Sequence, residues 1–274
     1  MANSPKVPLP PLDGWALVLG ASSGFGAAAS LKLAEAGSNV IGVHLDRRAT
    51  MPAVERLTGQ IKEFGREAWF FNVNACDPER RAEVLTEVSK RFDERGKGER
   101  IRVLLHSLAF GTLKPLVDAN PTEELSQKQM DMTLDVMAHS LVYWVQDVLR
   151  RELLRMDGRI FAMTSTGSSQ VWAGYGAVSA AKAALESHCR QLALELGPRG
   201  ITANTICAGV TNTPSMNKIP NATNLQEVAI RKNPSHRLTL PEDVGNALVA
   251  LSQTCTYWLN GNVLFVDGGE AHSG

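Results

Sequence analysis

Short apolar runs alternate along the chain with longer segments in which apolar residues recur at helical spacing. The runs have the length of buried strands and lie at residues 15–19, 39–45, 67–73, 101–111 (running into a loop), 159–165, 201–206 and 261–269. Helical spacing occurs at residues 27–37, 53–65, 78–92, 124–154, 174–197 and 241–252. Six or seven strands that alternate with helices predict an α/β fold, a doubly wound parallel sheet in three layers (αβα).

Composition narrows this picture. The 274 residues are 44% hydrophobic and carry no net charge, so no basic excess indicates binding to nucleic acid or a membrane surface. No repeat or linker interrupts the chain, and we expect a single domain over residues 1–274, with the proline-rich residues 1–13 as an arm over the first strand. The arm lacks the apolar region of a signal peptide, and no apolar run approaches the ~18 residues of a membrane span. Four scattered cysteines without paired histidines predict no metal site, and we expect a cytoplasmic protein.

A glycine-rich turn, G-A-S-S-G-F-G at residues 20–26, follows the first strand and opens the first helix. Glycines allow the backbone to approach a pyrophosphate, whose charge a helix N-terminus stabilises. The spacing G-x-x-x-G-x-G is wider than the usual dinucleotide motif, and the absence of a following Lys-Ser/Thr excludes a Walker A loop. The turn therefore predicts a dinucleotide site. A tight turn with packing glycines is the structural alternative.

The end of the second strand indicates which dinucleotide binds. An acidic residue there usually holds a free ribose 2′-hydroxyl, whereas a 2′-phosphate needs arginine or lysine. His44 stands at the strand end, and Asp46, Arg47 and Arg48 follow it. A guanidinium can hold a phosphate bidentately, so the arginine pair favours NADPH. Asp46 keeps NADH as the alternative, and a merely solvated arginine pair is the structural one.

Tyr175 and Lys182 stand at the start of the helical segment 174–197. Residues seven apart on an α-helix are almost two turns apart and share one face. A phenol and an ammonium on one face, with the Ser165 hydroxyl from the end of the fifth strand, can stabilise a developing oxyanion. A lysine beside the phenol would also lower the phenol's pKa. The alternative is a tyrosine at a helix start with a solvated lysine.

These motifs all follow strands, which is where ligands bind in doubly wound sheets. Asn72 and Val73 end the third strand, where an adenine could lie. Beyond the sixth strand, the polar and irregular residues from about 211 to 235 would form a loop region over the substrate. The convergence of the motifs on one edge of the sheet is stronger evidence for a site than any single motif.

Over nearly its whole length the chain resembles the short-chain dehydrogenase/reductase superfamily, whose sheet is of the Rossmann type. The resemblance rests on the glycine turn, Ser165, the Tyr175/Lys182 helix, A-G-V-T-N-T at residues 208–213 and G-N-V-L-F-V-D-G-G at residues 261–269. These motifs together are highly specific.

Departures from the standard pattern indicate one branch of that superfamily. Standard members carry Tyr-x3-Lys, but that tyrosine position is Val178 here, and Tyr-x6-Lys is the spacing of enoyl-acyl-carrier-protein reductases. The segment H-S-L-A at residues 106–109 resembles their H-S-I-G, and Met137 stands where the usual proton-relay asparagine is expected. Ser165 replaces a second tyrosine of the common bacterial enzyme, which makes the chain similar to the NADPH-using type III branch.

The resemblance implies that the chain reduces the C=C bond of a 2-enoyl thioester with NADPH in fatty-acid synthesis. The acyl group would be carried by acyl carrier protein or coenzyme A, and the protein would be a homotetramer. Tyr175, set back by one turn or up to about 5 Å, would stabilise the enolate, Lys182 would bind the nicotinamide ribose and Ser165 would be a supporting donor. Besides Lys182, the implied cofactor contacts are Gly20, Ser22, Ser23, Gly24, Phe25, Gly26, Arg47, Arg48, Asn72, Val73, Ser107, Ala109, Gly209, Thr211 and Thr213.

Two rival functions stay open. A carbonyl reductase of the same fold, acting for example on a 3-oxoacyl thioester, would pair Tyr175 with Ser165; the retained serine favours it, whereas Val178 and Met137 oppose it. A redox sensor that binds NADP without turnover is the rival from a different class. The presence of both Tyr175 and Lys182 opposes the sensor.

Overall fold

A computed structural model of the chain describes residues 9–96, 98–214, 216 and 222–273. Within these residues, seven parallel strands form one sheet in the order β3-β2-β1-β4-β5-β6-β7. The strands are β1 (Trp15–Leu19), β2 (Asn39–His44), β3 (Ala68–Asn72), β4 (Ile101–His106), β5 (Leu154–Thr164), β6 (Thr202–Ala208) and β7 (Val263–Val266). The predicted doubly wound parallel sheet is thus confirmed.

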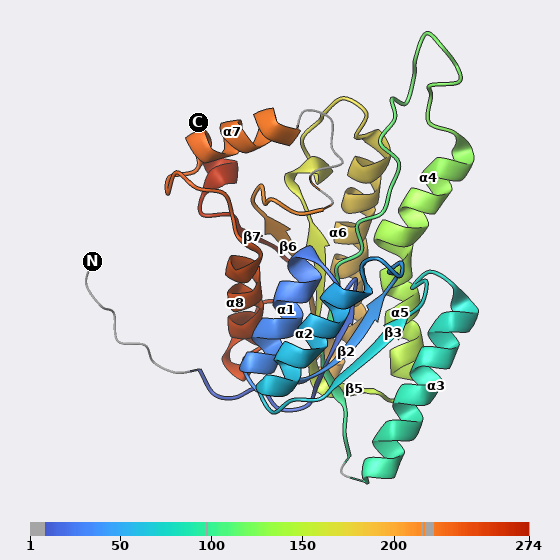
Figure 1. Cartoon of the computed structure of the whole chain (residues 1–274), viewed down its shortest axis with the longest axis vertical. Helices are drawn as coiled ribbons and strands as arrows, with labels where there is room; N and C mark the ends of the chain where they lie inside the picture. The colour runs from blue at the N-terminus through green and yellow to red at the C-terminus, as the bar shows by residue number, and fades with distance from the viewer. Residues whose placement is uncertain (1–8, 97, 215, 217–221, 274) are drawn as a thin grey trace.

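Helices cover both faces of the sheet (Figure 1). One layer contains α1 (Gly24–Glu35), α2 (Met51–Glu63) and α8 (Pro241–Leu251), and the other contains α3 (Pro78–Arg95), α4 (Gln127–Leu134), α5 (Ser140–Arg150) and α6 (Gly176–Leu196). In β1, Trp15 and Leu17 face the core under the second layer, whereas Ala16 and Val18 face the core under the first. Burial on both faces explains why the strands are continuous apolar runs. No helix of the described residues is both long and apolar enough to cross a membrane.

The helical pattern at residues 124–154 is not one continuous α-helix. α4 ends at Leu134, a π-helical segment spans Asp135–His139, and α5 begins at Ser140. The Thr133 hydroxyl donates to the Gln129 carbonyl (2.8 Å) and the Ser140 hydroxyl to the Val136 carbonyl (2.9 Å), and such bonds tend to bend helices. A π turn holds one extra residue and often lies at a functional site. Apolar periodicity does not register a single inserted residue, and the pattern therefore predicted one helix.

The stretch predicted as an irregular loop at about 211–235 contains a helix, α7 (Ala222–Lys232). Residues 215 and 217–221 of that stretch lie outside the described residues. α7 lies beyond the carboxyl ends of the strands, beside the C-terminus (Figure 1). After α7, the Asn233 side chain donates to the Asp267 carbonyl (2.8 Å), which ties this region to the end of β7.

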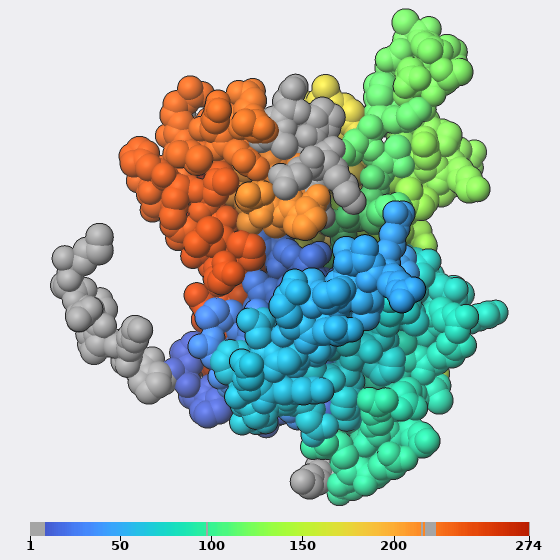
Figure 2. Space-filling model, viewed as in Figure 1, coloured from blue at the N-terminus to red at the C-terminus, as the bar shows by residue number. Residues whose placement is uncertain are grey.

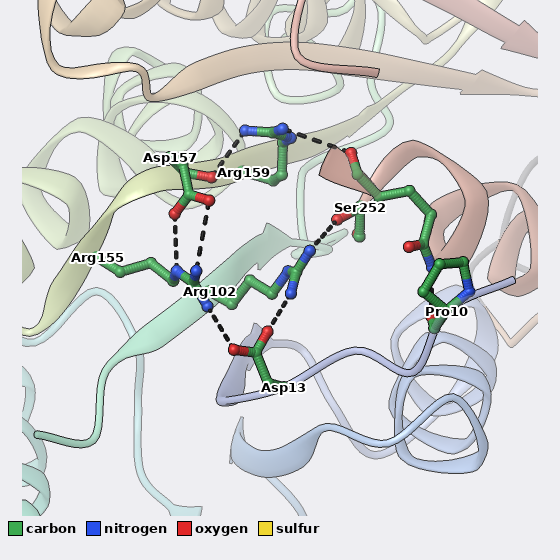
Figure 3. Close-up of polar contacts among 8 residues, drawn as sticks. Pro10, Asp13, Arg102, Arg155, Asp157, Arg159 and Ser252 are labelled. Atoms are coloured by element: carbon green, nitrogen blue, oxygen red, sulfur yellow. Dashed lines mark hydrogen bonds and ion pairs between the residues drawn. The ribbon is translucent and has the colours of Figure 1, made fainter. Parts of the chain in front are cut away.

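The predicted N-terminal arm is described from residue 9 onward, and residues 1–8 lie outside the described residues. Asp13 forms ion pairs with Arg102 and Arg155, at the amino-terminal ends of β4 and β5 (Figure 3). The Gln253 side chain donates to the Pro10 carbonyl (3.1 Å). These contacts join the arm to the base of the sheet, at the opposite end from the glycine turn.

Candidate active site

The glycine turn joins β1 to α1 at the carboxyl edge of the sheet. Gly20 has a φ of +84°, and a side chain there would collide with the Ser107 carbonyl; a side chain at Gly26 would collide with the Gly20 carbonyl. The Gly20 N–H donates to the Val43 carbonyl (2.8 Å), which holds the turn against β2. Ser23, the N-cap of α1, makes no side-chain capping bond to the first N–H groups of the helix. A backbone cradle in front of uncapped N–H groups fits the pyrophosphate of a dinucleotide.

Two other predicted cofactor residues lie against this turn. The Ser107 N–H donates to the Leu19 carbonyl (2.8 Å), and its own carbonyl faces Gly20. The methyl group of Thr213 lies 3.5 Å from where a Cβ on Gly24 would stand. The structure thus brings β4 and the segment after β6 to the start of α1.

The remaining cofactor candidates near this edge have other surroundings. The Thr211 hydroxyl donates to the Gly209 carbonyl (2.9 Å), and a side chain on Gly209 would collide with the Thr239 hydroxyl. Phe25 packs into the core under α1 and α8, and Ala109 is exposed in the loop after β4. Phe25 therefore supports the helix that carries the turn.

The end of β2 holds a fixed carboxylate. Nδ1 of the buried His44 lies 3.0 Å from Oδ2 of Asp46. The Asn72 side chain accepts from the Asp46 N–H (2.9 Å) and donates to the Asp46 carbonyl (3.0 Å). Burial opposes ionisation of Asp46, but hydrogen bonds with Ser22, Thr50 and His44 outweigh it and lower the pKa of the carboxyl group. Asn72, predicted to flank an adenine, thus fixes Asp46 beside a serine of the glycine turn.

Arg47 and Arg48 follow Asp46 and are exposed. The structure gives neither side chain an ion pair with another described residue. The Val73 N–H donates to the His44 carbonyl (2.8 Å), so the end of β3 lies directly beside this segment. The guanidinium groups of Arg47 and Arg48 and the carboxylate of Asp46 therefore follow the end of β2, where the ribose group that distinguishes NADPH from NADH would bind.

Ser165 and Tyr175 come together beyond the carboxyl end of β5. Ser165 follows the last residue of β5 in extended backbone, and Tyr175 immediately precedes α6. A side chain on Gly167 would collide with the Tyr175 ring and would lie 3.1 Å from Ser165 Oγ, so glycine is needed for the phenol to lie here. Trp172 packs edge-on against the phenol, with 5.5 Å between ring centres. Burial raises the pKa of Tyr175, and Ser165 opposes this rise.

Lys182 is buried on α6, almost two helical turns after Tyr175. Its ammonium donates to the Met163 carbonyl on β5 (2.7 Å). Burial lowers the pKa of Lys182 to about 8, whereas Glu186 and Cys207 act in the opposite direction. Lysine does not contribute the expected lowering of the Tyr175 pKa: burial raises this pKa, and the group that opposes the rise is Ser165.

Val178, at the position of the standard tyrosine, belongs to a small apolar cluster. It packs with Met137 and Ala181, and Tyr175 packs against the same cluster. A Cβ on Gly111 would lie 3.0 Å from Met137 Sδ and 3.1 Å from a Val178 methyl group, so the loop after β4 closes over it. Two positions that are polar in the standard pattern are therefore apolar here and buried together. Tyr175 is the phenol that this site presents.

Sequence reasoning missed the polar pair of His106 and Ser140. The His106 imidazole is fully buried at the end of β4, and its Nε2 lies 2.8 Å from Ser140 Oγ. A histidine that ends a buried strand was the available signal, but its partner comes from the π-helical region, which the pattern does not predict. No group of three or more His, Cys, Asp or Glu in the described part of the chain is arranged to hold a metal ion.

Comparison with known proteins adds to this geometry. The family model that matches residues 20–270 is described as Enoyl-(Acyl carrier protein) reductase. The chain is 27% identical to (2S)-[(R)-hydroxy(phenyl)methyl]succinyl-CoA dehydrogenase subunit BbsD of Thauera aromatica, over 93% of this chain and 96% of the relative. It is 29% identical to versicolorin reductase 1 of Aspergillus parasiticus, over 94% of this chain and 97% of the relative.

A solved structure with a similar fold is that of LugOII, a promiscuous reductase that catalyses keto-reduction at C1 during lugdunomycin biosynthesis. Its TM-score is 0.78 at 25% identity, and the match covers 94% of this chain and 97% of that one. The similarity in sequence and in structure thus extends over nearly the whole chain.

Proposed function

The chain belongs to the short-chain dehydrogenase/reductase superfamily of oxidoreductases, in the family described as Enoyl-(Acyl carrier protein) reductase, and we propose that it reduces a ketone with a nicotinamide dinucleotide. The observation that carries the proposal is the pair of Ser165 and Tyr175 side chains at the carboxyl edge of the sheet. Two hydroxyl donors at one place suit a carbonyl oxygen on which negative charge develops. The bound cofactor would supply the hydride to the carbonyl carbon.

Tyr175 is the proton donor in this proposal. Because burial raises the pKa of its phenol, the group carries its proton at neutral pH. The Ser165 hydroxyl is buried and makes no hydrogen bond of normal geometry within the described residues, so it can donate to the substrate oxygen. The proton passes from Tyr175 Oη to that oxygen, which leaves a phenolate on Tyr175.

Apolar side chains around this edge support a substrate with an apolar body. A side chain on Gly176, next to Tyr175, would lie 2.8 Å from Leu116 Cγ, so the loop between β4 and α4 lies over the start of α6. That part of the chain projects from the body of the molecule (Figure 2). Large apolar side chains are exposed on this loop at Phe110, Leu116 and Val117, and Val171 is exposed on the loop between β5 and α6. LugOII is described as catalysing keto-reduction, and versicolorin reductase 1 is named as a reductase, which agrees with the proposed reaction.

Reduction of an enoyl thioester, as expected from the resemblance, is the second candidate. It is favoured by Tyr175 standing one turn before Val178, with Val178 and Met137 closed into an apolar cluster. A phenol set back from the nicotinamide suits a thioester carbonyl that lies beyond the carbon taking the hydride. The acyl group would again be on acyl carrier protein or coenzyme A, in fatty-acid synthesis. The relatives support keto-reduction better, and we therefore place it first.

We keep NADPH as the proposed cofactor. The exposed guanidinium groups of Arg47 and Arg48 can reach a 2′-phosphate at the end of β2. The ionised Asp46, held by His44 and Asn72, would instead favour the free hydroxyls of NADH. NADPH binding would bring an arginine side chain to the ribose, whereas NADH binding would bring the Asp46 carboxylate to it.

A homotetramer in the cytoplasm also remains a proposal. β7 is an edge of the sheet, and Phe265 on it and Trp258 before it are exposed. An open edge with exposed aromatic side chains would be covered in an assembly of this chain. Light scattering on the purified protein measures its mass and tests this assembly.

The deciding experiment follows NADPH and NADH oxidation optically with three substrates: a tetralone, a β-ketoacyl thioester and a trans-enoyl thioester. We expect oxidation with a ketone, lost in Tyr175→Phe and reduced in Ser165→Ala. Turnover of the enoyl thioester alone would replace this proposal with the second candidate. Tight NADPH binding without turnover of any of the three would favour the redox sensor.

A further inference from the structure

The hydrogen bonds of Ser140 define the tautomer of His106. The Ser140 hydroxyl lies 2.9 Å from the Val136 carbonyl, which can only accept, and 2.8 Å from His106 Nε2. The single hydroxyl proton of Ser140 therefore goes to the carbonyl, and Ser140 Oγ accepts from His106 Nε2–H. His106 Nδ1 is then a bare acceptor.

His106 Nδ1 is buried and has no hydrogen-bond partner within the described residues. Buried polar atoms in this state are rare and usually indicate a bound water or a functional role. Burial, and after it the charge of Lys182, lowers the pKa of His106 to about 3, so the imidazole stays neutral. Its lone pair is available to a donor.

Lys182 is a nearby donor, since its charge acts on the His106 imidazole. His106 on β4 pairs in register with Ala162 on β5, and the Lys182 ammonium donates to the carbonyl of the next residue, Met163 (2.7 Å). An ammonium has three N–H groups, and this bond uses one. Lys182 is 5% exposed, so its other N–H groups also need acceptors.

We propose that His106 is a positioning residue for Lys182: its Nδ1 accepts a hydrogen bond from one water, which in turn accepts a hydrogen bond from the ammonium. Ser140 holds the imidazole in the tautomer that makes this possible. Met137, on the π-helical segment, offers only a weakly accepting thioether, whereas His106 offers an imidazole nitrogen. The catalytic part of the inference rests on the proposed function, and the contact itself does not.

The charged and titratable groups that face Lys182 come from three elements. Glu186 lies on α6 and accepts from the Thr164 hydroxyl (2.7 Å), Cys207 lies on β6, and His106 lies on β4. An acceptor stabilises the ammonium form. Loss of the His106 acceptor therefore lowers the pKa of Lys182 from about 8, and the alkaline limit of activity moves to lower pH.

The activity test compares His106→Leu with His106→Asn. Leucine removes the acceptor, whereas the asparagine carbonyl can stand where Nδ1 stood. In His106→Leu we expect kcat to fall about tenfold with little change in KM, and the alkaline limb to shift by about one pH unit. His106→Asn should recover most of the wild-type kcat and most of the wild-type alkaline limit. Equal behaviour of the two variants across the pH range would overturn the proposal.

A second readout needs no turnover. Nitrogen NMR of the imidazole in the wild-type protein should show His106 with a proton on Nε2 and none on Nδ1. The Nδ1 resonance should move in Lys182→Met, which removes the donor, and much less in Tyr175→Phe, the matched control. An unchanged Nδ1 resonance in a folded Lys182→Met protein would refute the contact. A shifted resonance in a protein that reduces none of the three substrates would leave the contact standing and refute only the proposed function.

Discussion

Replacing Asp13 with asparagine tests the ion-pair network at the base of the sheet (Figure 3). Asp13 bridges Arg102 and Arg155. The Arg102 side chain is only 9% exposed, whereas that of Asp13 is 70% exposed. Without the carboxylate, the nearly buried Arg102 guanidinium keeps its hydrogen bond to the Ser252 carbonyl (3.1 Å) but loses its counter-charge.

The expected loss in the free energy of unfolding lies between two limits. Removing one partner of a buried ion pair costs about 3–5 kcal/mol, whereas an exposed pair contributes about 0–1 kcal/mol. Because one partner here is buried and the other is mostly in solvent, we expect Asp13→Asn to lower the free energy of unfolding by about 2 kcal/mol. For a chain of this size that corresponds to a fall in Tm of about 4–8 °C.

The effect of pH gives the sharper test. Burial opposes ionisation of Asp13, but the hydrogen bond and charge of Arg155 and the charge of Arg102 outweigh it and lower its pKa. A carboxyl group with a lowered folded-state pKa stabilises the protein above its unfolded pKa of about 3.9. That stabilisation is lost as pH falls through the lower folded value. The difference between wild type and Asp13→Asn should therefore be constant near neutral pH and shrink in acid.

Urea unfolding at several pH values measures this difference. Glu83→Gln, which breaks the exposed Arg80–Glu83 pair, is the matched control and should cost less than about 0.5 kcal/mol. Arg102→Met added to Asp13→Asn should recover part of the loss, since no unpaired charge is left. The reasoning is refuted if Asp13→Asn unfolds like the control, or if its deficit persists undiminished in acid.

Two further predictions concern the cofactor. Gly26→Ala places a methyl group against the Gly20 carbonyl, so NADPH binding measured by fluorescence titration should be lost while the thermal transition stays cooperative; unchanged affinity would contradict the cradle. Arg47→Ala should raise the KM for NADPH about tenfold and leave that for NADH unchanged, because a phosphate contact with a charged group contributes about 1.5–3 kcal/mol. A larger effect on the KM for NADH would contradict the phosphate contact and would indicate that this segment binds the ribose of NADH through Asp46.

The glycine turn could be predicted from the sequence because its chemistry is local. Strand, turn and helix follow one another directly, and the glycine at position 26 is required by a collision with the Gly20 carbonyl inside the turn itself. The strands were equally clear, since burial on both faces leaves apolar runs such as that at residues 15–19. Periodicity and steric limits are both properties of short segments.

The polar contacts of the site could not be predicted in the same way. His44 and Asn72 end β2 and β3, Asp46 follows β2, and their mutual hydrogen bonds depend on the register between the two strands. The bond between His106 and Ser140 depends on the π turn, which rotates Ser140 relative to a regular helix. The direction of a pKa shift depends on burial as much as on neighbours. Sequence spacing carries no information on the depth of a side chain in the folded site.

The place of the phenol can be tested by moving it. Val178 is 5% exposed and packs with Met137 and Ala181, so a tyrosine there has no space without displacing the cluster. Overpacking of this kind costs about 1–3 kcal/mol. We therefore expect Tyr175→Phe/Val178→Tyr to fold with reduced stability and to remain without ketone or enoyl turnover, as Tyr175→Phe does alone. Thermal unfolding and NADPH oxidation with both substrate classes check the two parts. Recovery of ketone turnover in the double variant would mean that position 178 reaches the substrate, and that the apolar cluster opens during catalysis.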